Sequence, residues 1–149
     1  MVHALEIIHG LLKPGGTLID IHPSGEPPSI ELVQDRGRTL VGQRTLVGHL
    51  QESDNFIEYS QAQAALEQAL RLGWFDMERS GVFQFVVWSP SIGELRAYLD
   101  ENWSDAVLDP GIDQRLEGLI NSAQDIPSGW TTSVEMTETV KIARFKRKA

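Results

Sequence analysis

Cysteine is absent from this chain of 149 residues. Its absence excludes disulfide bonds, thiolate nucleophiles and thiolate metal ligands, and it agrees with a cytoplasmic location. The four histidines have neither the i, i+4 pair nor the short loop spacing that is typical of zinc ligands. They are His3, His9, His22 and His49. The sequence therefore predicts no metal site.

Positive charge and long apolar runs are also scarce. The chain has 13 Lys and Arg against 21 Asp and Glu, so its formal net charge is -8. Nucleic-acid affinity comes largely from Lys and Arg that neutralise phosphates, and we therefore expect no nucleic-acid partner. No apolar run approaches the length that crosses a bilayer, and the N-terminus lacks the pattern of a signal peptide. We expect a cytoplasmic protein without a membrane partner.

Familiar catalytic motifs are missing as well. Ser24 and Ser80 each precede a glycine, but neither lies in the Gly-x-Ser-x-Gly pattern of a nucleophile elbow. The acidic pair Asp100 and Glu101 is typical of a solvated helix end. The catalytic residues, if the chain has any, are unknown from the sequence.

The most informative segment runs from His3 to His22, HALEIIHGLLKPGGTLIDIH. Apolar residues recur in it at helical spacing, and Pro14 ends this predicted helix. Two glycines that can adopt positive φ follow, so the chain turns there. Thr17 to His22 then predicts a short strand that is buried on both faces. The apolar helix positions are Ala4, Leu5, Ile8, Leu11 and Leu12, and the glycines are Gly15 and Gly16.

The rest of the chain predicts further strands and helices. They are a hairpin over Ser29 to Val47, a helix from Ser53 or Asp54 to Gly73, a strand over Trp74 to Trp88 that can break at Ser80-Gly81, helices that open at Ser91 and at Asp109-Pro110, a turn over Asp125 to Gly129, and a strand over Thr131 to Lys146. The inward positions of the last two helices are Leu95, Tyr98, Leu99, Leu116, Leu119 and Ile120. In the last strand Val134, Met136, Val140 and Ile142 share one face.

No internal repeat, low-complexity block or linker interrupts this pattern, and we expect one domain over residues 1–149. The fold class is α/β, or α+β if the hairpin dominates. We expect a mixed sheet with an antiparallel C-terminal strand and flanking helices.

The helix, the Leu12 to Gly16 turn and the strand after it resemble the segment that opens the C-terminal third of class I S-adenosylmethionine-dependent methyltransferases. In that family the fifth strand follows four strands that carry the cofactor site, a helix leads on to the sixth strand, and a seventh strand inserts antiparallel between the fifth and sixth. Thr17 to His22, Trp74 to Trp88 and Thr131 to Lys146 look like the fifth, sixth and seventh strands. The resemblance implies a Rossmann-like architecture and small-molecule methyl transfer. The hairpin has no place in the family pattern.

The N-terminal cofactor half of that family has no counterpart here. The family's site needs a glycine-rich turn after its first strand and an acidic residue that ends its second strand, and the chain contains neither segment. We therefore assign no cofactor-binding residue and do not expect this chain alone to bind S-adenosylmethionine. The resemblance implies that cofactor only if the missing half is supplied.

Candidate substrate-pocket residues follow the first strand and flank the long aromatic strand. In open α/β sheets ligands bind beyond the carboxyl ends of strands, which is where His22, Ser24 and Glu26 lie. Trp74 and Trp88 would line an apolar pocket. The alternative is that the first three are solvated loop residues and the tryptophans belong to the core.

Thr17 to His22 has lost the neighbour that the fifth strand has in the complete family fold. One row of its backbone N–H and C=O groups is then open for pairing. We expect this edge to be covered by a second copy of the chain in a homodimer, by the Ser29 to Val47 hairpin, or by a complementary polypeptide.

Three functional interpretations remain open at this stage. The chain is a methyltransferase-like interaction or substrate-binding module without activity of its own. Alternatively, Met1 is internal to a longer chain, and the natural protein is a complete small-molecule methyltransferase. In the third interpretation the resemblance is accidental, and the chain is an unrelated α+β ligand-binding domain.

Overall fold

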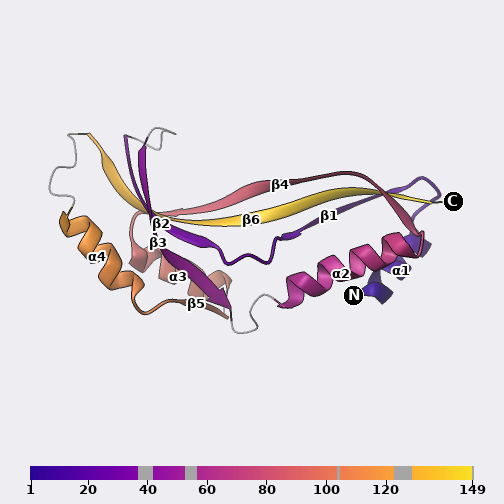
Figure 1. The fold of residues 1–149 in the computed structure, drawn as a ribbon, viewed down its shortest axis with the longest axis horizontal. Helices are drawn as coiled ribbons and strands as arrows, with labels where there is room; N and C mark the ends of the chain where they lie inside the picture. Colours follow the sequence, from indigo (N-terminus) through magenta and orange to yellow (C-terminus); the bar gives the residue numbers. More distant parts are fainter. Residues whose placement is uncertain (37–41, 53–56, 104, 123–128, 149) are drawn as a thin grey trace. The chain divides into compact units, whose positions relative to one another are not determined.

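A computed structural model describes residues 1–36, 42–52, 57–103, 105–122 and 129–148 of the chain (Figure 1). The helices and strands in these residues follow one another as α1 (Val2–Leu11), β1 (Thr17–Pro23), β2 (Ser29–Asp35), β3 (Gly42–Glu52), α2 (Ile57–Arg71), β4 (Phe75–Ser89), α3 (Ile92–Asn102), β5 (Ala106–Leu108), α4 (Ile112–Ser122) and β6 (Thr131–Arg147). None of the described helices is long and apolar enough to span a bilayer.

The chain divides into two compact units. The first unit comprises Met1–Glu26, Phe56–Gln84 and Thr139–Ala149, and the second comprises Pro27–Asn55 and Phe85–Glu138. Both β4 and β6 continue from one unit into the other. A single domain over residues 1–149 therefore stays a prediction, and each unit is described by itself.

In the first unit, the C-terminal half of β6 lies between two other strands (Figure 1). β1 pairs antiparallel with it from Thr17 opposite Lys146 to Pro23 opposite Val140. β4 also pairs with β6. Because β1 occupies one edge of this half of β6, β4 lies along the other edge.

Side-chain contacts show the direction of β4 against β6. Asp76 pairs with Lys148, Glu78 with Arg144 and Lys146, and Gln84 hydrogen-bonds with Thr139. As the residue numbers rise along β4, the residue numbers of their partners on β6 fall, so these two strands are antiparallel. Within the described residues β4 runs unbroken through Ser80 and Gly81, and the predicted break is absent there.

The helices α1 and α2 cover one face of these strands. Leu66 and Ala69 of α2, Phe75 of β4 and Phe145 of β6 form a buried cluster. Partly buried residues pack against that cluster, among them Leu5, Ile8, Leu12 and Leu18. The predicted stripe of α1 is wrong at Ala4, which is exposed, and at Leu11, which is 81% exposed, because α1 packs against the cluster only through Leu5, Ile8 and Leu12.

The turn between α1 and β1 confirms one glycine and corrects the other. Gly15 has a φ of 73°, as predicted. Gly16, in contrast, is not one of the described glycines with a positive φ. A Cβ atom at this position would lie 2.8 Å from the carbonyl oxygen of Lys13, which is too close. Gly16 therefore permits a close backbone approach, with its N–H donating to that same oxygen at 2.7 Å.

The strand β1 is not buried on both faces, in contrast to the sequence prediction. Leu18, Asp20 and His22 face the helices, whereas Ile19 and Ile21 on the opposite face are 51% and 58% exposed. We call this opposite side, which includes Ile142 of β6 across from Ile21, the outer face of the first unit. It is open because no described element of the first unit covers it.

In the second unit, β2 pairs with β3 and with the N-terminal half of β6, and β3 pairs with β5. This confirms the hairpin, although its turn at residues 37–41 lies outside the described residues. The hairpin does not cover the edge of β1, since its strand β2 is paired with β3 and β6 instead. In the strand order β1 stands at an end, with β6 as its only described neighbour.

The helices predicted from caps form close to the expected positions. Ser91 Oγ accepts from Glu94 N at 3.3 Å and opens α3, and Gly73 follows α2 with a φ of 75°. Asp109 Oδ1 accepts from Gly111 N at 2.8 Å before α4 begins at Ile112. The predicted caps Ser53 and Asp54 and most of the predicted turn at 125–129 lie outside the described residues.

The described strand pairs whose register is known are all antiparallel. The structure thus combines helices with an antiparallel sheet, which confirms the α+β form of the predicted fold class. No parallel pair of the mixed α/β sheet occurs among them.

The predicted inward face of α4 is wrong at one position, because Leu116 is buried at 3% exposure but Ile120 is 48% exposed.

We expect Leu116→Ala to lower the free energy of unfolding by about 2 to 5 kcal/mol, because it leaves a cavity in the core. Ile120→Ala, on the same helix, should lower it by less than about 1 kcal/mol. Urea unfolding of the two variants measures both values, and equal losses would contradict this assignment of the core.

Candidate functional site

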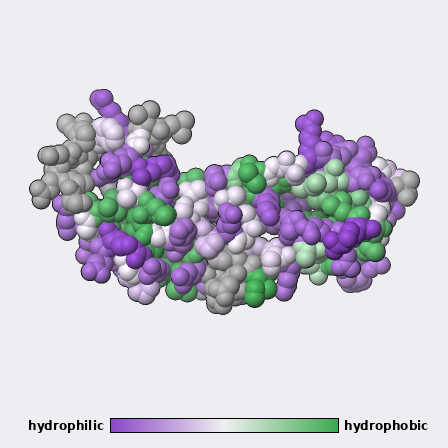
Figure 2. All heavy atoms as spheres, in the orientation of Figure 1, coloured by the Kyte–Doolittle hydropathy of each residue, from purple (hydrophilic) through white to green (hydrophobic). Residues whose placement is uncertain are grey.

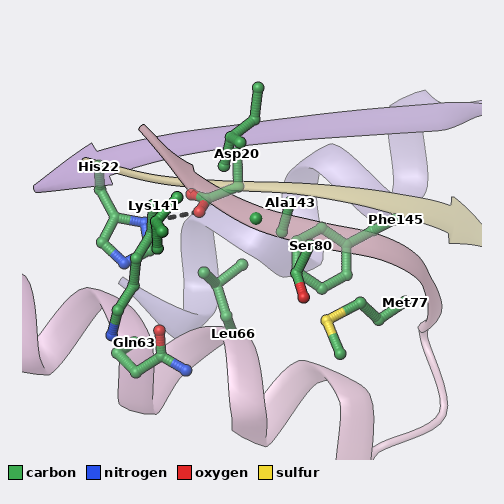
Figure 3. Close-up of a pocket in the computed structure, with 12 residues that line it drawn as sticks. Asp20, His22, Gln63, Leu66, Met77, Ser80, Lys141, Ala143 and Phe145 are labelled. Atoms are coloured by element: carbon green, nitrogen blue, oxygen red, sulfur yellow. Dashed lines mark hydrogen bonds and ion pairs between the residues drawn. The ribbon is translucent and has the colours of Figure 1, made fainter. Parts of the chain in front are cut away.

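The first unit contains a cavity of about 370 Å³ between its sheet and α2 (Figure 3). Four elements of that unit supply its lining, namely β1, α2, β4 and β6. The lining residues are Asp20, His22, Gln63, Leu66, Met77, Ser80, Gly81, Val82, Lys141, Ile142, Ala143 and Phe145. Cavities of this size hold small organic molecules.

Asp20 and His22 form the polar core of this site. They lie two residues apart on β1, and alternation along a strand therefore places both on the face that carries the cavity. The His22 Nδ1 to Asp20 Oδ2 distance is 2.6 Å, and the two side chains are only 11% and 21% exposed (Figure 3). This is a close, largely buried imidazole–carboxylate pair.

The pairing determines what each nitrogen of His22 can do. An ionised carboxylate only accepts hydrogen bonds, so Nδ1 of a neutral His22 carries the proton and donates to Asp20. Nε2 then holds a lone pair. This nitrogen is buried and has no hydrogen-bond partner in the structure. An unsatisfied buried acceptor is costly, and a ligand that donates a hydrogen bond to it removes that cost.

The cavity has a polar and an apolar end. Lys141 lies opposite His22 in the register of β1 and β6, and Gln63 of α2 lies at the same end (Figure 3). Phe145 and Met77 lie at the other, mainly apolar end together with Ser80, and Leu66 lies below the middle (Figure 3). The arrangement suits a small molecule with one polar group and an apolar body.

The five candidate pocket residues have different environments. His22 lines the cavity. Ser24 Oγ accepts from the backbone N–H of Glu26 at 3.2 Å, so these two residues form a local turn. Trp74 stacks on His9 with ring centroids 6.0 Å apart and packs against the buried cluster of the first unit. Trp88 belongs to the second unit and is 39% exposed.

Of the residues that line the cavity, only His22 was predicted from the sequence. Asp20 gave one usable signal, since a carboxylate two positions before a histidine shares its face in a strand. Lys141, Gln63 and Phe145 gave none, because their places depend on the pairing of β6 with β1 and on the packing of α2. The described residues contain no cluster of three or more potential metal ligands.

The second unit has charged groups with clear structural roles. Arg44 donates hydrogen bonds to Glu31, at 2.9 Å, and to Glu135. These contacts raise the pKa of Arg44 above its ordinary value, and the hydrogen bond to Glu31 is the main cause. Glu31 and Glu135 face each other on neighbouring strands, so Arg44 offsets their repulsion. The N–H of Gly111, and then Arg115, lower the pKa of Asp109.

A further cavity of about 330 Å³ lies in the second unit, lined in part by Asp113 and Glu117. Asp113 already pairs with Arg96 at 2.7 Å. The cavity of the first unit is the stronger candidate, because it contains a buried acceptor without a partner.

Comparison of the chain with protein-family models, curated proteins and solved structures finds no match. The site is therefore interpreted from its own geometry.

The Asp20–His22 pair should contribute measurably to stability. In a double-mutant cycle of Asp20→Ala and His22→Ala we expect a coupling free energy of about 1 kcal/mol or more, because each single change leaves a buried group without its partner. The matched control is His3 with Glu6, a pair 3.2 Å apart with both side chains mostly exposed. That pair should show no measurable coupling. Urea unfolding measures both cycles, and equal couplings would contradict the burial argument.

Proposed function

We propose that this chain forms the C-terminal, substrate-binding part of a class I S-adenosylmethionine-dependent methyltransferase and does not bind the cofactor by itself. The observation that carries the proposal is the place of β6 in the first unit. A C-terminal strand runs antiparallel between two strands that are far apart in the sequence, β1 and β4. In the family that the sequence resembles, the seventh strand lies antiparallel between the fifth and the sixth. By that resemblance β1 stands for the fifth strand, β4 for the sixth and β6 for the seventh.

The helices of the first unit support the same proposal. α1 precedes β1, and α2 precedes β4, which is the order of helix and strand that the resemblance implies. The two helices lie on one face of the strands, where they build the buried cluster with Phe75 and Phe145. The second unit, with its hairpin, is an addition to the family pattern.

The described residues do not fit a site for S-adenosylmethionine. Glycines with positive φ are Gly15, Gly25, Gly73 and Gly129. Gly15 and Gly129 precede strands, Gly25 lies between two strands, and Gly73 follows a helix. None of these four opens a helix after a strand, which is where a glycine-rich turn admits a nucleotide cofactor. The proposal therefore assigns cofactor binding to further polypeptide and no step of methyl transfer to this chain alone.

The open edge of β1 is the proposed place for that polypeptide. β1 ends the described strand order, and its outer face presents Ile19 and Ile21 to solvent. An exposed apolar row on an edge strand is a template for strand addition. A strand from the cofactor-binding half would satisfy the edge and bring that half next to the cavity side of β1. A second copy of the chain is the competing occupant.

The second candidate function is an α+β ligand-binding domain unrelated to methyltransferases. The observation that favours it is the second unit, whose antiparallel hairpin and α3–β5–α4 segment have no counterpart in the family pattern. The cavity would serve as the ligand site in this case too.

Cofactor binding tests the proposal. In a calorimetric titration the chain of 149 residues should give no heat of binding with S-adenosylmethionine or S-adenosylhomocysteine. The DNA upstream of the Met1 codon should then be read for an in-frame glycine-rich strand–turn–helix, and a polypeptide extended to include it should bind both compounds. Failure of that extended polypeptide to bind would contradict the proposal, and tight binding by the chain alone would contradict the assignment of the cofactor site.

Amide hydrogen exchange tests the open edge. In the chain alone, the β1 amides that point away from β6 should exchange as rapidly as loop amides, whereas β6 amides at Val140 to Lys146 should be protected, because β6 has a neighbour on each side. In a polypeptide that includes the cofactor half, the β1 amides should become protected. Protection that instead rises with the concentration of the chain alone, together with a dimer mass in light scattering, would assign the edge to a second copy.

A further inference from the structure

We infer that the cavity of the first unit binds a small neutral molecule with an apolar body and a hydroxyl group, and that this hydroxyl donates a hydrogen bond to Nε2 of His22. Only the role of this molecule as the methyl acceptor rests on the proposed function. Binding itself needs no cofactor.

The acceptor is preset by the contact between His22 and Asp20. Because Nδ1 donates to Asp20 Oδ2 at 2.6 Å, the lone pair of the neutral ring is held on Nε2. In the close-up, the ring's second nitrogen points away from Asp20 toward the end of the cavity where Lys141 and Gln63 lie (Figure 3).

The charges around this end favour a neutral donor. The carboxylate of Asp20 and the ammonium of Lys141 both line the cavity and offset each other in charge, so a ligand of either sign gains little there. A hydroxyl group carries no charge and donates one hydrogen bond, so it satisfies Nε2. It thereby removes the cost of an orphaned buried acceptor.

The remainder of the cavity determines the body of the ligand. Met77 and Phe145 offer thioether and aromatic surface at the end away from His22, where Ser80 also lies, and Leu66 offers aliphatic surface below the middle (Figure 3). A Met sulfur and a Phe ring are good neighbours for a flat aromatic ring. A volume of about 370 Å³ accommodates a molecule of one or two fused rings.

Access to Nε2 requires a side chain to move, since the atom is shielded from solvent. Lys141 stands directly across from His22 on β6, and its long side chain is the most flexible one at this end of the cavity.

The test compares two probes that share one apolar body. The probe 2-naphthol carries the hydroxyl, and 2-methoxynaphthalene carries a methyl ether that cannot donate. Both are titrated into the full chain, labelled with nitrogen-15 on histidine, at about pH 8, where a free imidazole is neutral. We expect 2-naphthol to bind about five- to tenfold more tightly, as one hydrogen bond to a buried acceptor would give.

The histidine spectrum identifies the acceptor directly. In the free chain, His22 should carry its proton on Nδ1, and 2-naphthol should shift its Nε2 signal. His3, whose Nδ1 lies 3.2 Å from Glu6 in an exposed pair, is the internal control and should not shift. In His22→Phe, 2-naphthol and 2-methoxynaphthalene should bind within about twofold of each other, because the acceptor is gone.

Three results would overturn the inference. They are a His22 proton on Nε2 in the free chain, equal affinities of the two probes for the unaltered chain, and no binding of 2-naphthol up to its solubility limit. The probe comparison on the unaltered chain decides the matter even if His22→Phe does not fold. None of these results bears on cofactor binding by the extended polypeptide, so failure here and failure of the proposed function are separate outcomes.

Discussion

The antiparallel register between β1 and β6 is the constraint on which the first unit depends. It places Leu18 opposite Phe145 and His22 opposite Lys141, so the same face carries the buried cluster and the polar end of the cavity. Side chains alternate with a period of two, and a slip of one residue in β1 would turn Asp20 and His22 to the outer face. The hydrogen bonds of two strands more than a hundred residues apart in sequence thus determine whether the site exists.

Local patterns were sufficient to predict most individual elements. The apolar stripe of α2, the Ser91 cap of α3 and the β2–β3 hairpin follow from side chains close together in the sequence. Burial was less predictable, because it depends on what packs against an element. Leu11 and Ile120 fit a helical period but remain 81% and 48% exposed, and β1 looked doubly buried although its outer face is open. For the site, position at the carboxyl end of a strand was enough to select His22, whereas Lys141 depends on the long-range register.

The Asp20–His22 pair shows how a small binding site can obtain directionality without a charged ligand group. The carboxylate fixes the ring and its tautomer, and the cavity shields the remaining nitrogen from water. A ligand that reaches this nitrogen finds an acceptor that is already oriented and has no competing solvent, so little ordering remains to be done on binding. The apolar end of the cavity adds contact area with the ligand but constrains its orientation little. Selectivity would therefore come from one hydrogen bond, and affinity mostly from the rings.

The ion pairs on the outer face of the first unit have a consequence for its behaviour in solution. Arg144 stands opposite Ile19 and pairs with Glu78 at 2.8 Å, and Lys146 lies 3.7 Å from the same carboxylate. Charged side chains beside an exposed apolar row act as gatekeepers against aggregation, because any strand that docks there must match their charge or bury them unpaired. The outer face is thereby protected from indiscriminate stacking into fibrils. The edge of β1 stays open to strand pairing, because Arg144 and Glu78 lie on β6 and β4 rather than beside that edge.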